Sequence, residues 1–246
     1  MGAGAGHAGR GVSRPVLLAV AHGSRDPAAQ RSVLSLAGRA GELAPGIEVL
    51  TAFVQNARPS LAEALTAAGQ RQVIVVPLLL SAGYHLSTDI GEAAGRAGVP
   101  VAAPLGPHPG LVPALADRLR AAGAPPGTPV VLAAAGSTDP RAAGDALNQA
   151  ALLASHLQAP VRAAFASAAR PTVGEAVADL AARTGGPVAV ASYLLAPGVF
   201  AGRLRASGAS WVSAPLGDHP AVAGLILERF RGVAEQRLLT GSGSRR

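Results

Sequence analysis

The two halves of this chain carry the same short motifs in the same order, and this duplication constrains the fold more than any other feature. Gly23-Ser24 corresponds to Gly136-Ser137, and His108-Pro109 corresponds to His219-Pro220. The spacing between matching motifs stays almost constant along the chain. A tandem duplication of one structural unit accounts for this pattern, and the Pro- and Gly-rich segment Ala121–Pro129 is the predicted linker between the copies.

Within each half, short apolar runs alternate with longer segments of helical periodicity. This alternation is typical of parallel strands joined by crossover helices. We therefore predict an α/β fold of two tandem α/β sandwich domains, each with a mainly parallel sheet flanked by helices. The predicted strands are Val16–Ala21, Ile47–Phe53, Val73–Val76, Val99–Ala102, Val130–Ala134, Val161–Phe165, Val188–Ala191 and Ala209–Val212. The predicted helices follow Pro27, Pro59, Thr88 and Pro109 in the first half, and begin at Pro140, Pro171, about Gly198 and Pro220 in the second.

The predicted domain organisation has four parts: residues 1–14 and 239–246 as disordered tails, 15–124 as the N-terminal domain with the site, and 125–238 as a degenerate repeat domain. No run of ~18 apolar residues predicts a transmembrane helix. The N-terminal segment lacks the apolar core of a signal peptide. We therefore expect a cytoplasmic protein with no membrane partner.

Composition excludes several kinds of chemistry. The 246 residues include no cysteine and no lysine, which rules out disulfides, thiolate nucleophiles, Walker A loops and Schiff bases. The net charge of +7 comes from arginine, which suits small polycarboxylates, although a compositional bias of the source accounts for the same arginines. No helix-turn-helix or zinc-finger pattern accompanies the charge, so nucleic acid is not expected as a partner.

Two histidines occur in only one of the two repeats. His22 follows the first predicted strand and His85 lies beyond the third, whereas Ala135 and Phe200 stand at the matching places in the second half. Loops at the carboxyl ends of parallel strands meet at one edge of the sheet. Two imidazoles at that edge could bind a divalent metal, or one of them could act as a general base. A loop histidine can also serve only as a hydrogen-bonding plug.

Other residues near these histidines favour an anionic, flat ligand. Gly23 and Ser24 open the helix after the first strand, where free N–H groups favour an anion, and Arg25 adds a positive charge. The segment Leu78–His85 is apolar and contains a glycine, as expected for the wall of a hydrophobic site. His108 and His219 occur at equivalent places in both repeats, so we expect each to cap a helix or to close the fold.

Three motifs together resemble the sirohydrochlorin chelatases of the CbiX and SirB type, which are class II chelatases. They are HGSRDP at 22–27, PLLLSAGYH at 77–85 and PLGPHP at 104–109. The resemblance implies a chelatase-like fold and insertion of Co(II) or Fe(II), the metal substrate, into sirohydrochlorin, a polycarboxylate tetrapyrrole, in cobalamin or sirohaem biosynthesis. It implies no organic cofactor. It also implies His22 and His85 as catalytic and metal-binding residues. The substrate-binding residues are then expected to be Gly23, Ser24, Arg25, Leu80, Ser81, Ala82, Gly83 and Tyr84.

The chain departs from this family pattern after the second predicted strand. The family often has a glutamate there, whereas this chain has Gln55, which is a possible third site position. An amide can coordinate or hydrogen-bond but cannot accept a proton. Asp89 or Glu63 could replace the carboxylate, the protein could be slower, or it could be a non-catalytic metal or tetrapyrrole carrier. The oligomeric state stays open at this point.

Overall fold

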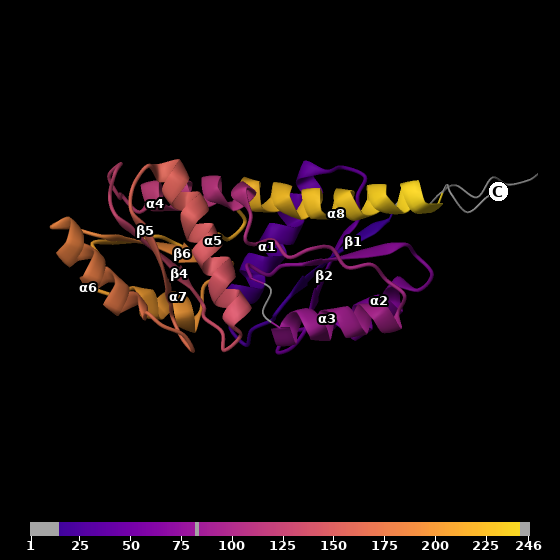
Figure 1. Ribbon diagram of the computed structural model, residues 1–246. Helices are drawn as coiled ribbons and strands as arrows, with labels where there is room; N and C mark the ends of the chain where they lie inside the picture. The colour runs from indigo at the N-terminus through magenta and orange to yellow at the C-terminus, as the bar shows by residue number, and fades with distance from the viewer. Residues whose placement is uncertain (1–14, 82–83, 242–246) are drawn as a thin grey trace, which may run out of the picture.

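The computed structural model describes residues 15–81 and 84–241, and it contains two parallel β-sheets side by side in an elongated molecule (Figure 1). The strand orders are β2-β1-β3 in the first sheet and β5-β4-β6-β7 in the second. The predicted fold class is therefore confirmed. The N-terminal tail predicted for residues 1–14 lies outside the described residues. No helix in the described ranges has both the length and the apolar composition needed to cross a membrane.

The first sheet is built around a strand that is buried on both faces. Its strands are β1 (Val16–Ala21), β2 (Val49–Phe53) and β3 (Val73–Pro77). Alternate residues of β1 enter two different hydrophobic clusters, as the two-residue period of a strand requires. Helix α1 (Pro27–Leu43) covers one face, and α2 (Leu61–Ala68) and α3 (Tyr84–Arg96) cover the other.

The second sheet repeats this plan. Its strands are β4 (Val130–Ala134), β5 (Val161–Phe165), β6 (Ala189–Tyr193) and the short β7 (Trp211–Val212). Helix α5 (Pro140–Leu157) lies on one face, and α6 (Val173–Thr184) and α7 (Val199–Leu204) lie on the other. Asp26 and Asp139 cap α1 and α5 in the same way, each ahead of a proline that begins the helix.

The last helix of each repeat packs on the sheet of the other repeat. Helix α4 (Val112–Ala121), which follows the 3-10 turn η1 (Pro109–Leu111), contacts β6 and α5 of the second repeat. Helix α8 (Pro220–Gly241) contacts α1 and β3 of the first and runs along that half of the molecule in Figure 1. One hydrophobic cluster therefore extends from the first sheet to the second. Sequence similarity between the repeats does not predict this exchange.

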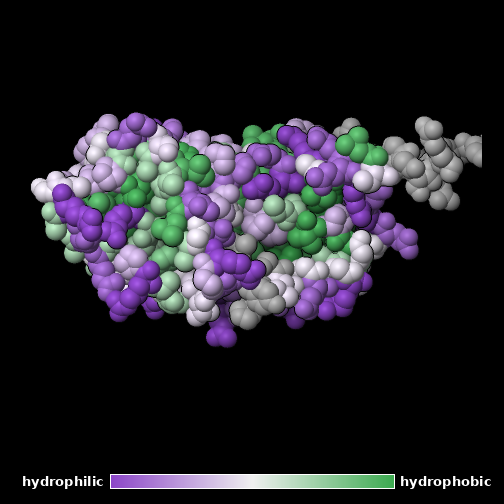
Figure 2. Space-filling view, viewed as in Figure 1, coloured by the Kyte–Doolittle hydropathy of each residue, from purple (hydrophilic) through white to green (hydrophobic). Residues whose placement is uncertain are grey.

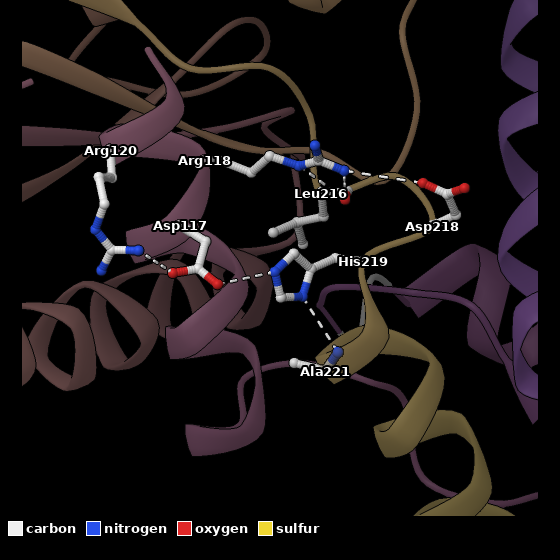
Figure 3. A network of polar contacts seen from close by, with 7 residues as sticks. All are labelled: Asp117, Arg118, Arg120, Leu216, Asp218, His219 and Ala221. Carbon is white, nitrogen blue, oxygen red and sulfur yellow. Dashed lines mark hydrogen bonds and ion pairs between the residues drawn. The ribbon is translucent and has the colours of Figure 1, made fainter. Parts of the chain in front are cut away.

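Polar contacts around the start of α8 join the exchanged helices (Figure 3). The His219 Nδ1 atom accepts a hydrogen bond from the Ala221 N–H, and its Nε2 lies 3.2 Å from Asp117 Oδ2 on α4. Hydrogen bonds from Arg120 and His219 hold the pKa of the Asp117 carboxyl below its usual value. The Arg118 guanidinium donates to the Leu216 carbonyl oxygen at 2.8 Å. The predicted capping role of His219 is thus confirmed.

Three sequence predictions need correction. The strand expected at Val99–Ala102 is reduced to a single bridge between Val75 and Val101, because Pro100 has no N–H to continue the ladder. The helix expected after Thr88 begins at Tyr84, since the chain is already helical where the hydroxyl residue suggested a cap. Helix α8 continues to Gly241, past the predicted start of the C-terminal tail at residue 239.

Strand boundaries differ by smaller amounts. The strands predicted to start at Ile47, Val188 and Ala209 start instead at Val49, Ala189 and Trp211.

Candidate active site

The loops after β1 and β2 bring His22 and Gln55 together at the edge of the first sheet. The Gln55 N–H donates to the His22 carbonyl oxygen at 3.0 Å, which extends the pairing of the two strands beyond their ends. The side chains meet as well, with 2.7 Å between His22 Nε2 and Gln55 Nε2. Both side chains are exposed, so an external ligand can reach the imidazole.

Gly23 allows this close approach of the two loops. Its φ angle is +96°, and a Cβ atom at this position would lie 1.7 Å from the Gln55 carbonyl oxygen. Only glycine fits such a conformation at such a distance. Gly136 has the same role in the second repeat, with φ +92° and 1.8 Å to the Ser167 carbonyl oxygen.

Two hollows of about 450 and 540 Å³ adjoin His22, and residues of both repeats line them. Both hollows include His22, Leu78, Leu195 and Phe200 in their walls. Their other walls are mostly apolar, as a flat hydrophobic ligand requires. In the smaller hollow the remaining lining residues are Leu79, Leu80, Ser81, Ala134, Ala135, Gly136, Ser137, Ala142, Ala146, Phe165, Tyr193 and Leu194. Apolar residues also reach the surface in both halves of the molecule, between hydrophilic ones (Figure 2).

The backbone supports the correspondence between His85 and Phe200. Helices α3 and α7 begin at Tyr84 and Val199, so His85 and Phe200 are each the second residue of their helix. The Phe200 ring is 38% exposed and lines both hollows. The side chain of His85 lies outside the described part of the structure. The second repeat thus presents an alanine and an aromatic ring at the places where the first has histidines.

The predicted substrate-binding residues fall into three groups. Leu80 and Ser81 line the smaller hollow, and Gly23 and Ser24 line the larger one. Arg25 is exposed and is absent from the described walls of both hollows. For the remaining three, Ala82 and Gly83 lie outside the described residues, and only the backbone of Tyr84 is described, as the first residue of α3.

The anion site expected at the start of α1 already holds a carboxylate of the chain. Asp26 Oδ1 accepts a hydrogen bond from the Ala28 N–H at 2.8 Å, and Ser24 Oγ accepts one from the Asp26 N–H at 3.0 Å. The Gln30 side chain donates to the Ser24 carbonyl oxygen at 2.7 Å. A negative charge from a ligand would meet the Asp26 carboxylate here, so Asp26 competes with a ligand for this helix start.

Glu63 is also engaged and is a poor replacement for a carboxylate beside His22. It forms a capping box with Ser60 at the start of α2 and an ion pair with Arg58. The hydrogen bonds from Ser60, assisted by Arg58, hold the pKa of Glu63 below its usual value. Asp89 is exposed on α3. Among the described side chains, no three His, Asp or Glu residues are grouped as metal ligands.

Tyr193 is a site residue that the sequence did not indicate. Its hydroxyl donates to the Leu80 carbonyl oxygen at 2.7 Å, so the second repeat holds the loop of the first. Burial raises the pKa of Tyr193, which keeps the hydroxyl protonated and able to donate. A Cβ atom at Gly106 would lie 2.1 Å from this hydroxyl oxygen, which explains the glycine of the PLGPHP motif. Nothing in the repeat pattern marks Tyr193, because the contact joins two repeats.

A protein-family model described as CbiX matches residues 16–122 and matches again at residues 129–233. The chain belongs to the CbiX family. This CbiX-family chain is 33% identical over 79 residues to the sirohydrochlorin cobaltochelatase of Methanococcoides burtonii. That match covers 31% of the chain and 60% of the relative's length.

Two solved structures extend the similarity over most of the chain. SirB from Bacillus subtilis, with Fe3+, is 26% identical with a TM-score of 0.74, over 89% of this chain and 94% of that one. DR2241 from Deinococcus radiodurans, a multi-domain protein with structural similarity to chelatases, is 26% identical with a TM-score of 0.69, over 88% and 54%. The tandem chelatase-like architecture of this CbiX-family protein is therefore shared with known structures.

Proposed function

We propose that this CbiX-family protein inserts Co(II) or Fe(II) into sirohydrochlorin or a related polycarboxylate tetrapyrrole, in cobalamin or sirohaem biosynthesis. The observation that carries the proposal is the exposed His22–Gln55 pair beside two mostly apolar hollows that the repeats form together. A planar macrocycle needs such walls, and a metal needs an accessible imidazole. No organic cofactor takes part, and the metal ion is a substrate.

In this proposal His22 and His85 hold the incoming metal ion, and the ring nitrogens then replace them as ligands. The ring N–H protons must leave as the cation enters, so a proton acceptor is needed. Two protons leave for each divalent ion. Once the ring nitrogens have taken the metal from His22, the lone pair of its imidazole is free to accept one of them, since the ordinary pKa of an imidazole lies near neutrality. Solvent water accepts the other. Gln55 orients the His22 ring through the 2.7 Å contact but cannot take the proton itself. His22 therefore serves both as ligand and as base.

A non-catalytic carrier is the second candidate, and Gln55 is the observation that favours it. A carrier would keep the imidazoles and the apolar hollows without a carboxylate to accept protons. Turnover separates the two functions. The measurement is a series of anaerobic absorbance spectra of the protein with sirohydrochlorin and either Co(II) or Fe(II). A chelatase will form many moles of metallated product per mole of protein. A carrier would give spectral changes that stop at one equivalent of protein.

Histidine variants test the site within the same assay. We expect His22→Ala and His85→Ala each to lower the initial rate by at least about 100-fold, because each removes a metal ligand. His156→Ala, on the exposed face of α5, is the matched control and should keep the wild-type rate. Near-normal rates in either site variant, with an unchanged melting temperature, would remove that histidine from the mechanism.

A further inference from the structure

Arg203 on α7 brings a positive charge into the wall of the larger hollow. It lines this hollow together with His22 and Phe200, although it belongs to the degenerate repeat. In the walls of the two hollows, as far as their residues are described, it is the only arginine. Its Cζ atom lies 5.8 Å from the centre of the Phe200 ring, one helical turn earlier. The stacked ring restrains the guanidinium at the edge of the apolar surface.

The contacts of Arg203 differ from those of three arginines that precede it in the second repeat. Arg162 and Arg183 pair with Asp179, and Arg170 pairs with Glu175. Within the described ranges, no carboxylate forms an ion pair with Arg203. Its polar contact is one long hydrogen bond, 3.4 Å, to the Ala166 carbonyl oxygen. Such a bond is weak, so an external anion can take the guanidinium without breaking a strong internal contact.

We propose that Arg203 binds a peripheral carboxylate of the tetrapyrrole while Phe200 packs against the edge of the macrocycle. This inference rests on the proposed function and deepens it. The inference gives the repeat that lacks the histidines a function of its own: the first repeat holds the metal, and the second holds the tetrapyrrole. A guanidinium suits this task, since its planar fork matches a carboxylate. The start of α1, which already holds Asp26, does not offer such a site.

The role predicts a particular kinetic signature. A contact to a side-chain carboxylate is made equally in the bound substrate and in the transition state, so its loss raises KM and leaves kcat unchanged. A structural role for Arg203 would instead lower the melting temperature or the amount of folded protein. A role in metal delivery would lower kcat.

The test compares Arg203→Gln with Arg205→Gln. Arg205 is an exposed arginine at the C-cap of the same short helix and does not line either hollow in the described structure. Sirohydrochlorin is titrated into the full-length protein without metal, and fluorescence quenching reports the Kd. We expect Arg203→Gln to weaken binding about fivefold to tenfold, and Arg205→Gln to leave it unchanged. Arg203→Lys should restore part of the affinity, because it keeps the charge but loses the fork.

Two further measurements, the salt dependence of the Kd and the metallation of sirohydrochlorin, separate this inference from the proposed function. Wild-type affinity should fall with ionic strength more steeply than that of Arg203→Gln, since the lost contact is between charges. Equal Kd values and equal salt dependence in the two glutamine variants would overturn the inference, even if the protein metallates sirohydrochlorin. Failure of the wild type to metallate the macrocycle would reject the proposed function alone, provided that Arg203→Gln still weakens binding.

Discussion

The contact between His22 and Gln55 limits the proton chemistry of the site. An amide can donate through its nitrogen or accept through its oxygen, so it can pair with either tautomer of the imidazole. It offers no group that titrates near neutral pH. Proton removal therefore depends on the imidazole, whose lone pair is also needed by the metal. A carboxylate in place of the amide would separate these two tasks.

We predict that Gln55→Glu raises the chelation rate near neutral pH. A positioned general base contributes on the order of 10² to 10⁴-fold, and even partial recovery is measurable. The gain should fade as the new carboxylate protonates, toward pH ~4 for an unperturbed Glu. The measurement is the initial rate of metal insertion between pH 4 and pH 8.

Asn56→Asp is the matched control, because it adds the same charge to the same loop, on the neighbouring residue. A gain of similar size in Asn56→Asp would assign the effect to general electrostatics. An unchanged or lower rate in Gln55→Glu, with tetrapyrrole affinity preserved, would show that Gln55 does not occupy the base position.

The glycines of the two repeats allow a second comparison at this scale. Gly23→Ala and Gly136→Ala introduce the same strain at φ near +90° and the same overlap with a carbonyl oxygen. Each should lower stability by at least about 1–3 kcal/mol, measured by urea denaturation. Only Gly23→Ala should also weaken Co(II) binding, since it alone moves the Gln55 loop away from His22. Equal Co(II) affinity in both variants would show that the metal site does not depend on this approach.

The sequence alone supports some of these residues better than others. His22 could be singled out because the second repeat has Ala135 at the same place. Gln55 was identified only through the family pattern, although its contact with His22 is local to two adjacent strands. Tyr193 and Arg203 escaped prediction because their importance comes from facing the other repeat across the hollows. Periodicity and motif spacing carry no information about such contacts.

At the scale of helices and strands, the features that depend on sequence signals within a few residues were predicted well. The caps of α1 and α5 follow directly from Asp-Pro, since the carboxylate and the proline each satisfy a local requirement of a helix start. The strand at Val99–Ala102 failed for a local reason too, the missing N–H of Pro100. The start of α3 was missed because Thr88 resembles a cap within a segment that is already helical.

The capping histidine His108 makes the stability of the exchanged helices depend on pH. Its Nδ1 accepts from the Gly110 N–H at 3.1 Å, and its Nε2 lies 3.4 Å from Glu228 Oε1 on α8. Burial lowers the pKa of His108, and the charge of Arg229 acts in the same direction, against the carboxylate of Glu228. The unfolded chain therefore binds the proton more readily than the folded one. Stability should fall as the pH drops below about 6.5.

We predict that His108→Asn reduces this loss of stability in acid. Asparagine can cap the helix through its side-chain oxygen but does not titrate. The measurement is the melting temperature at pH 7.5 and at pH 5.5. The difference between these two melting temperatures should be smaller in His108→Asn than in the wild type. His156→Asn, on an exposed helix face, should keep the wild-type difference. The same difference in the wild type and in both variants would mean that His108 does not contribute to the loss of stability in acid.

At the scale of the whole molecule, the exchange of α4 and α8 joins the two repeats into one folding unit. The repeat pattern predicts two similar units, but it is identical whether each last helix packs on its own sheet or on the other one. Both helices follow a Pro-Leu-Gly motif and a histidine cap, so local signals do not distinguish the arrangements either. Only the contacts of the folded chain reveal that each sheet needs a helix from the opposite repeat.

We therefore predict that residues 15–124 alone do not form a folded monomer. Without α8, the face of the first sheet that carries Leu17 and Ile74 keeps α1 but loses the helix that packs on β3, and α4 loses its contact with β6. Each large side chain left exposed costs about 1.5–3 kcal/mol, and α8 contributes Leu225, Ile226 and Phe230 among others to this core. A small domain cannot lose that much and stay folded.

Because α4 and α8 follow equivalent motifs, the fragment 15–124 should instead pair with a second copy of itself, with each α4 covering the partner's sheet. Light scattering after gel filtration measures this, and adding the separately produced fragment 129–241 should convert the homodimer into a heterodimer. A monomeric fragment 15–124 with a cooperative melt would show that the first repeat does not depend on the exchanged helix.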